Sequence, residues 1–428
     1  MKPHLVRPAL QQLVIPTLEG IVDHDAVWVG SLDVEDMKPG QDLELEDGGR
    51  FSKARLLIWD SNRVRGFVDL NVSSGTIDAN DLLNSICSLP DVAAVTTEVP
   101  TFPISVIVCT RDRPAELSSC LAALLDLQHP DFEIIVVDNA PTTDATRNIV
   151  ERLSDKNVRY VREDIPGLSR ARNAGVRISQ REYLAFTDDD VIVDSRWLDA
   201  LMRGFALDNR IGCVTGLVAS GQLESASQRY FDRRVGWASN TSLTLFRLDD
   251  PPDGVPLFPF QFGAYGTGAN FAAKRSLLFG IGGFDEALGV GSPTGAGEDT
   301  DWFIRVVLEG HTLLYQPDAV VWHKHRVDDE GLSAQLENYG LGLGAVIAKL
   351  AGNSKARRSM APKIVRAVLH TRNILRVEET NPREIGTGNG YREFRGMLRG
   401  PWALFRARRH GLPRPLLSEM AARSKSWG

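Results

Sequence analysis

Short apolar runs alternate with amphipathic stretches from residue 103 to residue 190. Ile104–Thr110, Phe132–Val137 and Tyr183–Phe186 are unbroken apolar runs of strand length. Unbroken rather than alternating hydrophobicity is typical of parallel strands that are covered on both faces. After the first run, five apolar residues recur with the spacing of one helix face: Leu117, Cys120, Leu121, Leu124 and Leu125.

The same alternation continues to the third run. Ala145, Ile149, Val150 and Leu153 mark a second helix, Val158–Tyr160 can supply a strand, and Gly167–Ser179 reads as a helix. Strands and helices that alternate in this way predict an α/β fold with a doubly wound, mostly parallel sheet. Such sheets bind ligands at the carboxyl ends of their strands.

Residues 1–100 have a different pattern and predict a small strand-rich domain. Ala26–Leu32, Ala54–Trp59 and Val64–Leu70 read as strands, the last two as a hairpin, and Asp78–Leu89 reads as a short helix. Prolines at 90, 100 and 103 then indicate a linker. We find no catalytic cluster here and expect a scaffold or docking module. The α/β domain is expected to cover residues 101–328.

Two later segments complete the pattern. Ala219–Pro259 has no clear periodicity and suits a mobile acceptor or donor loop. Residues 329–428 are expected to form a helical, basic C-terminal region that begins with one packed helix, Leu332–Leu350. Glycines at 340, 342 and 344 permit close contact with a neighbour or a break within this helix.

The overall composition is that of a soluble globular protein. The 428 residues are 43 % hydrophobic and 24 % charged, and no window resembles a membrane span. The first twenty residues lack the apolar core and cleavage site of a signal peptide. Four separated cysteines, without any CxxC pair, are expected to be buried thiols: Cys87, Cys109, Cys120 and Cys213. We therefore expect a cytoplasmic protein.

The net charge of −6 conceals an asymmetry. Residues 353–428 hold 17 Lys and Arg against 5 Asp and Glu, which leaves 32 against 50 in the first 352 residues. A basic tail on an acidic body suggests an anionic partner, either a membrane surface, a polyanionic acceptor or another subunit. Peripheral binding to the inner face of the plasma membrane is one expectation. Without a recognisable reading module, nucleic acid is not expected.

The polar residues of the α/β half gather where strands end. Thr110-Arg111-Asp112, Asp138-Asn139 and Asp188-Asp189-Asp190 each follow a predicted strand. Adjacent carboxylates repel one another, so a divalent cation such as Mg²⁺ or Mn²⁺ together with a bound diphosphate would stabilise the third group. An acidic solvated loop is the simpler alternative. The phosphate-binding patterns GxGxxG and GxxxxGK[ST] are absent, which disfavours NAD and ATP.

Seven segments, in order, resemble the family 2 glycosyltransferases. They are PISVIVCTRDRP, EIIVVDNAP, GLSRARNAG, YLAFTDDDVIVDSRWL, GTGANFAAKRSLLFGIGGFDEALG, GAGEDTDWFIRVVLEGH and YQPDAVVWH. The match covers about residues 103–325. The resemblance implies a GT-A fold, a nucleotide-sugar donor, a divalent metal ion and inversion at the anomeric carbon.

The resemblance also implies roles for individual residues. Those assigned to the nucleotide sugar are Thr110, Arg111, Asp112, Asp138 (to the base), Asn139, Arg170 or Arg172, Asp188, Asp189 and Glu298. Metal binding is assigned to Asp190 or Asp189, with His323 as a further metal or diphosphate ligand. Asp299 would be the general base. As alternatives, Glu298 and Asp299 are acids that favour a helix N-terminus, and His323 is a hydrogen-bonded structural histidine. Arg111 and Arg113 could be solvated.

The chemistry is consistent with these residue types. In an inverting transfer one carboxylate takes the proton of the attacking hydroxyl, while a cation stabilises the departing diphosphate. Trp237 is a candidate for stacking on a sugar, whereas Trp302 is expected in the core. A QxxRW motif is absent, which favours addition of a single sugar.

The sequence thus predicts a metal-dependent transferase that moves one sugar from a nucleoside diphosphate to a hydroxyl. UDP- or dTDP-sugars are the favoured donors, and a glycan or lipid-linked acceptor in surface glycan or glycolipid assembly is expected. Two alternatives stay open. One is a non-catalytic nucleotide-sugar-binding or scaffold protein, and the other is a sugar nucleotidyltransferase. The oligomeric state is left open.

Overall fold

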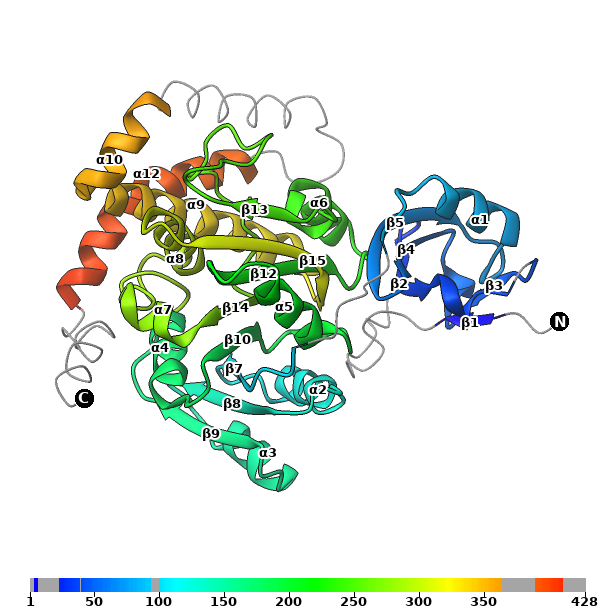
Figure 1. Ribbon diagram of the computed structural model, residues 1–428, viewed down its shortest axis with the longest axis horizontal. Helices are drawn as coiled ribbons and strands as arrows, with labels where there is room; N and C mark the ends of the chain where they lie inside the picture. Colours follow the sequence, from blue (N-terminus) through cyan, green and yellow to red (C-terminus); the bar gives the residue numbers. More distant parts are fainter. Residues whose placement is uncertain (1–3, 7–22, 39, 94–99, 364–388, 411–428) are drawn as a thin grey trace.

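The computed structural model describes residues 4–6, 23–38, 40–93, 100–363 and 389–410. Figure 1 shows a small unit near the N-terminus, a large α/β unit built on one sheet, and C-terminal helices on the side of the sheet away from the small unit.

A nine-stranded sheet organises the α/β unit. Its strands are β7 (Ile104–Thr110), β8 (Phe132–Asn139), β9 (Val158–Glu163), β10 (Tyr183–Asp188), β11 (Val191–Val193), β12 (Ile211–Ser220), β13 (Thr244–Phe246), β14 (Asn270–Lys274) and β15 (Thr312–His323). The strand order is β11-β15-β12-β14-β10-β7-β8-β9, with β13 beside β15. β7, β8, β9, β10, β12 and β15 run in one direction, and β11, β13 and β14 oppose them. The predicted mixed α/β fold with a mostly parallel sheet is therefore confirmed.

Helices cover both faces of this sheet. They are α2 (Pro114–Leu125), α3 (Ala145–Leu153), α4 (Leu168–Ile178), α5 (Trp197–Ala206), α7 (Arg275–Gly280) and α8 (Glu298–Leu308). α2, α3 and α5 share a core with one face, and α4, α7 and α8 share a core with the other. Strand β7 shows why its run is unbroken: Val106 and Val108 enter the first core, whereas Ile107 and Cys109 enter the second.

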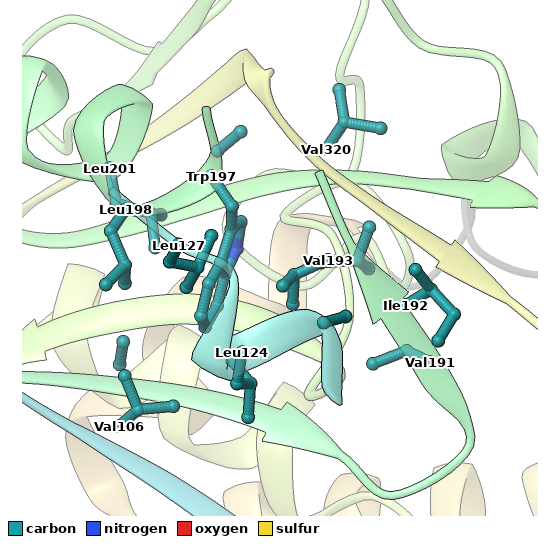
Figure 2. Packing of buried hydrophobic residues seen from close by; sticks show 14 of the residues in the cluster. Val106, Leu124, Leu127, Val191, Ile192, Val193, Trp197, Leu198, Leu201 and Val320 are labelled. Carbon is teal, nitrogen blue, oxygen red and sulfur yellow. The ribbon is translucent and has the colours of Figure 1, made fainter. Parts of the chain in front are cut away.

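Trp197 anchors the first core. Its indole is fully buried, and Figure 2 shows it among Leu124, Leu127 and Leu198. The ring nitrogen donates to Asn270 Oδ1 on β14 at 2.8 Å, so the polar edge of this large side chain is satisfied inside the core. This packing fixes α5 against the strands whose ends carry the polar residues.

Two expectations fail. The segment Ala219–Pro259 is not an unstructured loop, because it contains α6 (Ala226–Arg234), the short helix η3 (Gly236–Ala238) and β13. A capping box starts α6, in which the side chains of Ser225 and Gln228 each bond the other's backbone N–H. The S-x-x-Q spacing in the sequence is the signal for this capping box.

The second failed expectation concerns the cysteines. Cys87 is exposed at the end of α1 (Ala79–Cys87), while the other three are buried.

The N-terminal unit consists of short strands and one helix. They are β1 (His4–Val6), β2 (Val27–Asp33), β3 (Leu43–Leu45), β4 (Lys53–Asp60), β5 (Arg63–Asn71), β6 (Thr76–Ile77) and α1 (Ala79–Cys87), with the 3-10 helices η1 (Val34–Asp36) and η2 (Gly48–Arg50). β4 and β5 form the predicted hairpin, in which Ser61 and Asn62 both have positive φ, at 51° and 63°. The division of the chain at residue 100 stays a prediction.

The C-terminal region is helical where it is described. It comprises α9 (Asp329–Gly352), α10 (Ser354–Met360), η4 (Ala361–Lys363) and α12 (Asn389–His410). α9 is unbroken, so its glycines serve close contact: a Cβ at Gly340 or Gly344 would collide with the backbone of α12, and one at Gly342 with Ala296. The parts 364–388 and 411–428 of the predicted basic region lie outside the described residues. Among the helices described, none is both long and apolar enough to cross a membrane.

Candidate functional site

A cavity of about 740 Å³ lies at the carboxyl ends of the parallel strands. Residues from β7, β8, β10 and β15, the loop before α8 and helix α9 line it. Of the residues predicted for the site, ten line this cavity: Thr110, Arg111, Asn139, Arg172, Asp188, Asp189, Asp190, Glu298, Asp299 and His323. The predicted convergence of the strand-end loops is therefore present in the structure.

The sheet order explains how distant residues meet. β10, β7 and β8 are parallel neighbours, which places Asp188, Thr110 and Asn139 at one edge. After the aspartates the chain turns back as β11, which pairs with β15 so that Val191 lies opposite His323. Lys324 N then donates to the Asp190 carbonyl at 3.2 Å. The last aspartate and the histidine are brought together by this antiparallel pair.

Arg172 links the two acidic groups of the site. Its guanidinium donates to Glu298 Oε1 at 2.9 Å, to Asp188 Oδ1 at 3.3 Å and to the Gly268 carbonyl at 3.0 Å. Arg172 and Glu298 are both buried. Burial and the neighbouring Asp299 raise the pKa of Glu298 to about 7, although Arg172 opposes the shift. Glu298 is thus a buried partner of Arg172 that also borders the cavity.

Arg113 forms ion pairs with the other two aspartates, Asp189 and Asp190. It donates from Nη1 to Asp189 Oδ1 at 3.0 Å and to Asp190 Oδ2 at 2.9 Å. The Thr110 hydroxyl donates to the second oxygen of Asp189 at 2.7 Å. Burial and Asp190 raise the pKa of Asp189 to about 7. Both Asp189 oxygens therefore have hydrogen-bond partners in the cavity wall, and the assignment of this residue to the metal ion stays a prediction.

Asp190 and His323 lie next to each other in the cavity wall and could together hold a cation. His323 Nε2 lies 3.3 Å from Asp190 Oδ1. Burial would raise the pKa of Asp190, but His323, Arg113 and Arg326 hold it well below its ordinary value. Burial would lower the pKa of His323, and Asp190 raises it. At this distance an Nε2–H can donate to the Asp190 carboxylate, whereas an Nε2 lone pair would need a cation between the two atoms.

This donor set fits a divalent cation that is shared with a phosphate ligand. Within the described residues, no three His, Cys, Asp or Glu side chains are arranged to hold a metal ion by themselves. Mg²⁺ and Mn²⁺, however, prefer one or two carboxylates completed by phosphate oxygens and water over an all-protein cage. Asp190 and His323 can supply the protein part, and Asp188, the last residue of β10, lies two residues before Asp190.

Asp299 is held differently from the other acids. Its Oδ2 accepts from Gly268 N at 2.7 Å, and its Oδ1 accepts from Thr300 N at 2.6 Å and the Thr300 hydroxyl at 3.2 Å. The preceding Gly297 caps α8 with φ 95°, a left-handed conformation that suits glycine. Asp299 therefore sits in the first turn of α8, half-buried, at the cavity wall.

Three predicted residues do not line the cavity. Asp112 is exposed and accepts from Thr142 N at 2.9 Å. Arg170 pairs with Glu286 at 2.6 Å, so of the two candidate arginines, Arg170 and Arg172, only Arg172 lines the cavity. Asp138 is buried behind it, where Tyr160 donates to Oδ2 at 3.0 Å and Oδ1 has no hydrogen-bond partner among the residues described. The assignment of Arg170 to the nucleotide sugar is thus not supported.

The structure adds residues that the sequence did not single out. They are Arg113, Lys324, Arg326 and four side chains of α9, namely Ala334, Gln335, Asn338 and Tyr339. For Arg113, which precedes a predicted helix, solvation was one alternative, and only the fold shows its two ion pairs. Trp237 lines the cavity, as a sugar-stacking candidate should, and Trp302 is fully buried in the core, as expected.

Comparison with known proteins gives consistent matches. Residues 105–258 match the sequence model described as "Glycosyl transferase family 2". The chain is 29 % identical over 175 residues to the "Pre-mycofactocin glycosyltransferase" of Mycobacterium tuberculosis, covering 41 % of this chain and 33 % of the relative. It is 28 % identical over 228 residues to the "Succinoglycan biosynthesis protein ExoM" of Rhizobium meliloti, covering 52 % and 66 %.

One similar solved structure is the mannosyltransferase PcManGT of Pyrobaculum calidifontis, described in complex with GDP-Man and Mn²⁺. The two share 19 % identity with a TM-score of 0.46, over 76 % of this chain and 80 % of that one. The chain spans only part of both curated relatives, a third of the first and 66 % of the second. The matched segment carries the predicted strands and the aspartate cluster, and this part of the chain is similar to the family 2 glycosyltransferases.

Proposed function

We propose that this protein transfers a single sugar, with inversion, from a nucleoside diphosphate sugar to a hydroxyl acceptor. The observation that carries the proposal is one cavity with two kinds of carboxylate. Asp190 lies beside His323 at one wall, while Asp299 is held by neutral donors at another. The first arrangement suits a cation and a diphosphate, and the second suits a proton acceptor.

The residues at the ends of β7 and β8 are proposed to bind the nucleoside. Arg111 borders the cavity, and Asn139 shapes it by bonding the backbone of Ile165 and Gly167 at 2.9 and 2.8 Å. Asp138 follows Val137 on the same strand, and its Oδ1, which has no hydrogen-bond partner among the described residues, is proposed to accept from a base N–H. Arg113, Lys324 and Arg326 bring positive charge to the side on which the diphosphate would lie.

Asp190 and His323 would hold a Mn²⁺ or Mg²⁺ ion. The ion would stabilise the negative charge that develops on the departing diphosphate. Asp188 stays bonded to Arg172, and this pair keeps the strand end in place.

Asp299 is proposed to take the proton of the attacking hydroxyl. A general base must accept a proton without giving up its position, and the backbone N–H groups of Gly268 and Thr300 fix this carboxylate while leaving lone pairs free. Trp237 offers an apolar ring to a sugar. The acceptor would then attack from the side of the cavity that α9 closes.

A titration of donors tests the proposal. UDP, dTDP and GDP and their sugars are titrated calorimetrically with and without Mn²⁺. We expect one nucleoside diphosphate to bind in a Mn²⁺-dependent manner, with UDP or dTDP favoured, and transfer to follow when a suitable hydroxyl acceptor is present. Absence of binding by all of them would favour a scaffold function. Formation of pyrophosphate from a sugar phosphate and a nucleoside triphosphate would instead indicate a nucleotidyltransferase.

The setting is proposed to be glycan or glycolipid assembly at an anionic membrane surface. One relative is named for succinoglycan biosynthesis, which supports the first part. Helix α12 supports the second. Four of its large apolar side chains recur at i, i+7, i+11 and i+14 and are exposed, at 68, 65, 63 and 48 %: Tyr391, Leu398, Trp402 and Phe405. We call this set the α12 stripe.

Arginines surround the α12 stripe, while the opposite side of the helix packs on α9 through Gly396, Gly400, Ala403 and Ala407. Exposed aromatic rings flanked by cations match the headgroup region of an anionic leaflet. In Figure 1, α12 lies on the side of the molecule away from the N-terminal unit. A lipid-linked acceptor could be presented there.

Vesicle flotation tests this surface. The full chain should float with phosphatidylglycerol vesicles and not with neutral phosphatidylcholine vesicles, and W402A/F405A should abolish flotation. Leu207, 59 % exposed on the far end of α5, provides the matched control L207A, which should float normally. Equal flotation of W402A/F405A would remove the membrane assignment. Loss of a dimer, rather than of flotation, in the double variant would reassign the stripe to contact between copies.

A further inference from the structure

A chain of hydrogen bonds runs from His323 to the N-terminal unit. His323 Nδ1 and His325 Nδ1 are 3.0 Å apart, His325 Nε2 lies 2.9 Å from the Ser220 hydroxyl, and that hydroxyl donates to Asp232 Oδ1 at 2.6 Å. Arg55 of β4 then donates to the second oxygen of Asp232 at 2.6 Å. These contacts join β15, β12 and α6 of the α/β unit to β4 of the N-terminal unit.

The direction of each hydrogen bond follows from the partners. Ser220 has one hydroxyl proton, and Asp232 accepts it, so Ser220 must accept from His325 Nε2–H. The neutral His325 ring is then left with a lone pair on Nδ1. His323 Nδ1–H donates to this lone pair, which assigns the tautomer of His323.

The consequence falls on the other nitrogen of His323. With its proton on Nδ1, the neutral ring presents the Nε2 lone pair, and this atom lies 3.3 Å from Asp190 Oδ1. That is the form in which histidine ligates a metal ion, and ligating histidines commonly donate their other N–H to a fixed acceptor. Here the acceptor is a second histidine, itself held by a serine and a carboxylate.

Packing keeps this chain of hydrogen bonds rigid. His325 and Ser220 are buried, and Phe231 of α6 lies against the His325 ring with the ring centroids 4.8 Å apart. Asp69 of β5 bonds Arg55 through both oxygens, at 2.8 and 3.3 Å, so the last member of the chain is itself fixed. A second contact acts on the same strand, because Asp318 of β15 accepts from Val64 N at 2.9 Å.

We propose that Asp232, through Ser220 and His325, is a positioning residue that sets His323 for cation binding, and that the N-terminal unit supports it through Arg55. The inference rests on the cation site of the proposed function. The proposed positioning role connects the N-terminal unit to the cation site. From the sequence alone we expected this unit to be a scaffold or docking module without a catalytic cluster.

Mn²⁺ binding to the full chain tests the inference without any turnover. Inorganic pyrophosphate stands in for the donor diphosphate, free Mn²⁺ is read by electron paramagnetic resonance, and spin-echo modulation of bound Mn²⁺ reports a coordinated imidazole nitrogen. We expect S220A and D232A to weaken Mn²⁺ binding about 10- to 100-fold and to diminish the imidazole signal. S220T keeps the hydroxyl and should retain both.

The matched control breaks a different contact between the same two units. Glu224 pairs with Arg50 at 3.3 Å and takes no part in the hydrogen-bonded chain, so E224Q should bind Mn²⁺ as the wild type does. If D232A does not fold, S220A carries the same expectation, because Ser220 lies inside the α/β unit.

The outcomes separate this inference from the proposed function. Wild-type Mn²⁺ binding with an imidazole signal that S220A and D232A leave unchanged would overturn the positioning role and leave the cation site standing. Wild-type binding without an imidazole signal would also overturn it, since His323 would then not be a ligand. Absence of Mn²⁺ binding by the wild type would remove the cation site and the positioning role together.

Discussion

The two acidic clusters that line the cavity are held in opposite ways. In the first, every aspartate contacts a basic side chain: Asp188 contacts Arg172, Asp189 contacts Arg113, and Asp190 contacts Arg113 and His323. In the second, Glu298 contacts Arg172, but the donors to Asp299 among the described residues are backbone N–H groups and one hydroxyl.

This difference indicates a division of labour. His323 and Arg113 hold the pKa of Asp190 well below its ordinary value, whereas burial raises the pKa of Asp188 and Asp189, which are fixed in ion pairs with Arg172 and Arg113. Asp299, by contrast, accepts hydrogen bonds only from neutral donors within the described part of the chain. We therefore propose that the cluster at the end of β10 holds the cation and that Asp299 takes the proton.

The largest effect is expected from D299N. An asparagine keeps the shape and can still accept from Gly268 N, but it cannot take a proton, so transfer should slow by about 10²- to 10⁴-fold. Donor affinity should stay within about twofold of wild type. Steady-state transfer rates and donor calorimetry on the same preparation measure both. A variant that transfers at the wild-type rate would show that another group is the base.

The next effect is on stability and compares the two arginines. R172M leaves the buried Glu298 without its partner and should lower the free energy of unfolding by about 3–5 kcal/mol. R113M should cost less than about 1 kcal/mol, because the Arg113 side chain is 35 % exposed and Asp189 keeps the hydrogen bond from Thr110. Urea unfolding of the two variants measures the difference. Equal losses would mean that the two ion-pair networks are not distinct.

The smallest effect concerns a histidine–carboxylate pair outside the cavity. His129 lies 3.0 Å from both Asp199 Oδ1 and the Phe102 carbonyl. Burial would lower the pKa of His129, but these two acceptors raise it above the ordinary value. A raised folded pKa adds stability below about pH 6.5, and that stability is lost as the pH rises through the folded pKa.

Urea unfolding at about pH 6 and about pH 8 checks this pair. The wild type should lose more stability over that interval than H129Q does. If H129Q loses as much stability between the two pH values as the wild type does, the titrating group would be assigned to the cavity instead of His129. The contrast between the cavity and its surroundings would then weaken.

The sequence predicted which strand ends meet because the signals were local. Unbroken apolar runs define β7, β8 and β10, and each ends in polar residues, so a parallel sheet must bring Thr110, Asn139 and Asp188 together. The acids at 298 and 299 open α8, as their preference for a helix N-terminus suggested.

The sequence could not show what long-range pairing creates. Ser220 and His325 are 105 positions apart, and they meet only because β12 and β15 are parallel neighbours. Arg113 appeared solvated because its two partners lie more than 70 positions later. The α9 wall was also missed, since an apolar helix with three glycines gives no sign of which side borders a ligand.

One measurement tests the division of labour most directly. A donor nucleoside diphosphate sugar is titrated with and without Mn²⁺ into the wild type, D190N and D299N. We predict that Mn²⁺ strengthens donor binding in the wild type and in D299N but not in D190N. Loss of the Mn²⁺ effect in both variants, or its retention in both, would contradict the assignment of cation binding to one cluster and proton transfer to the other.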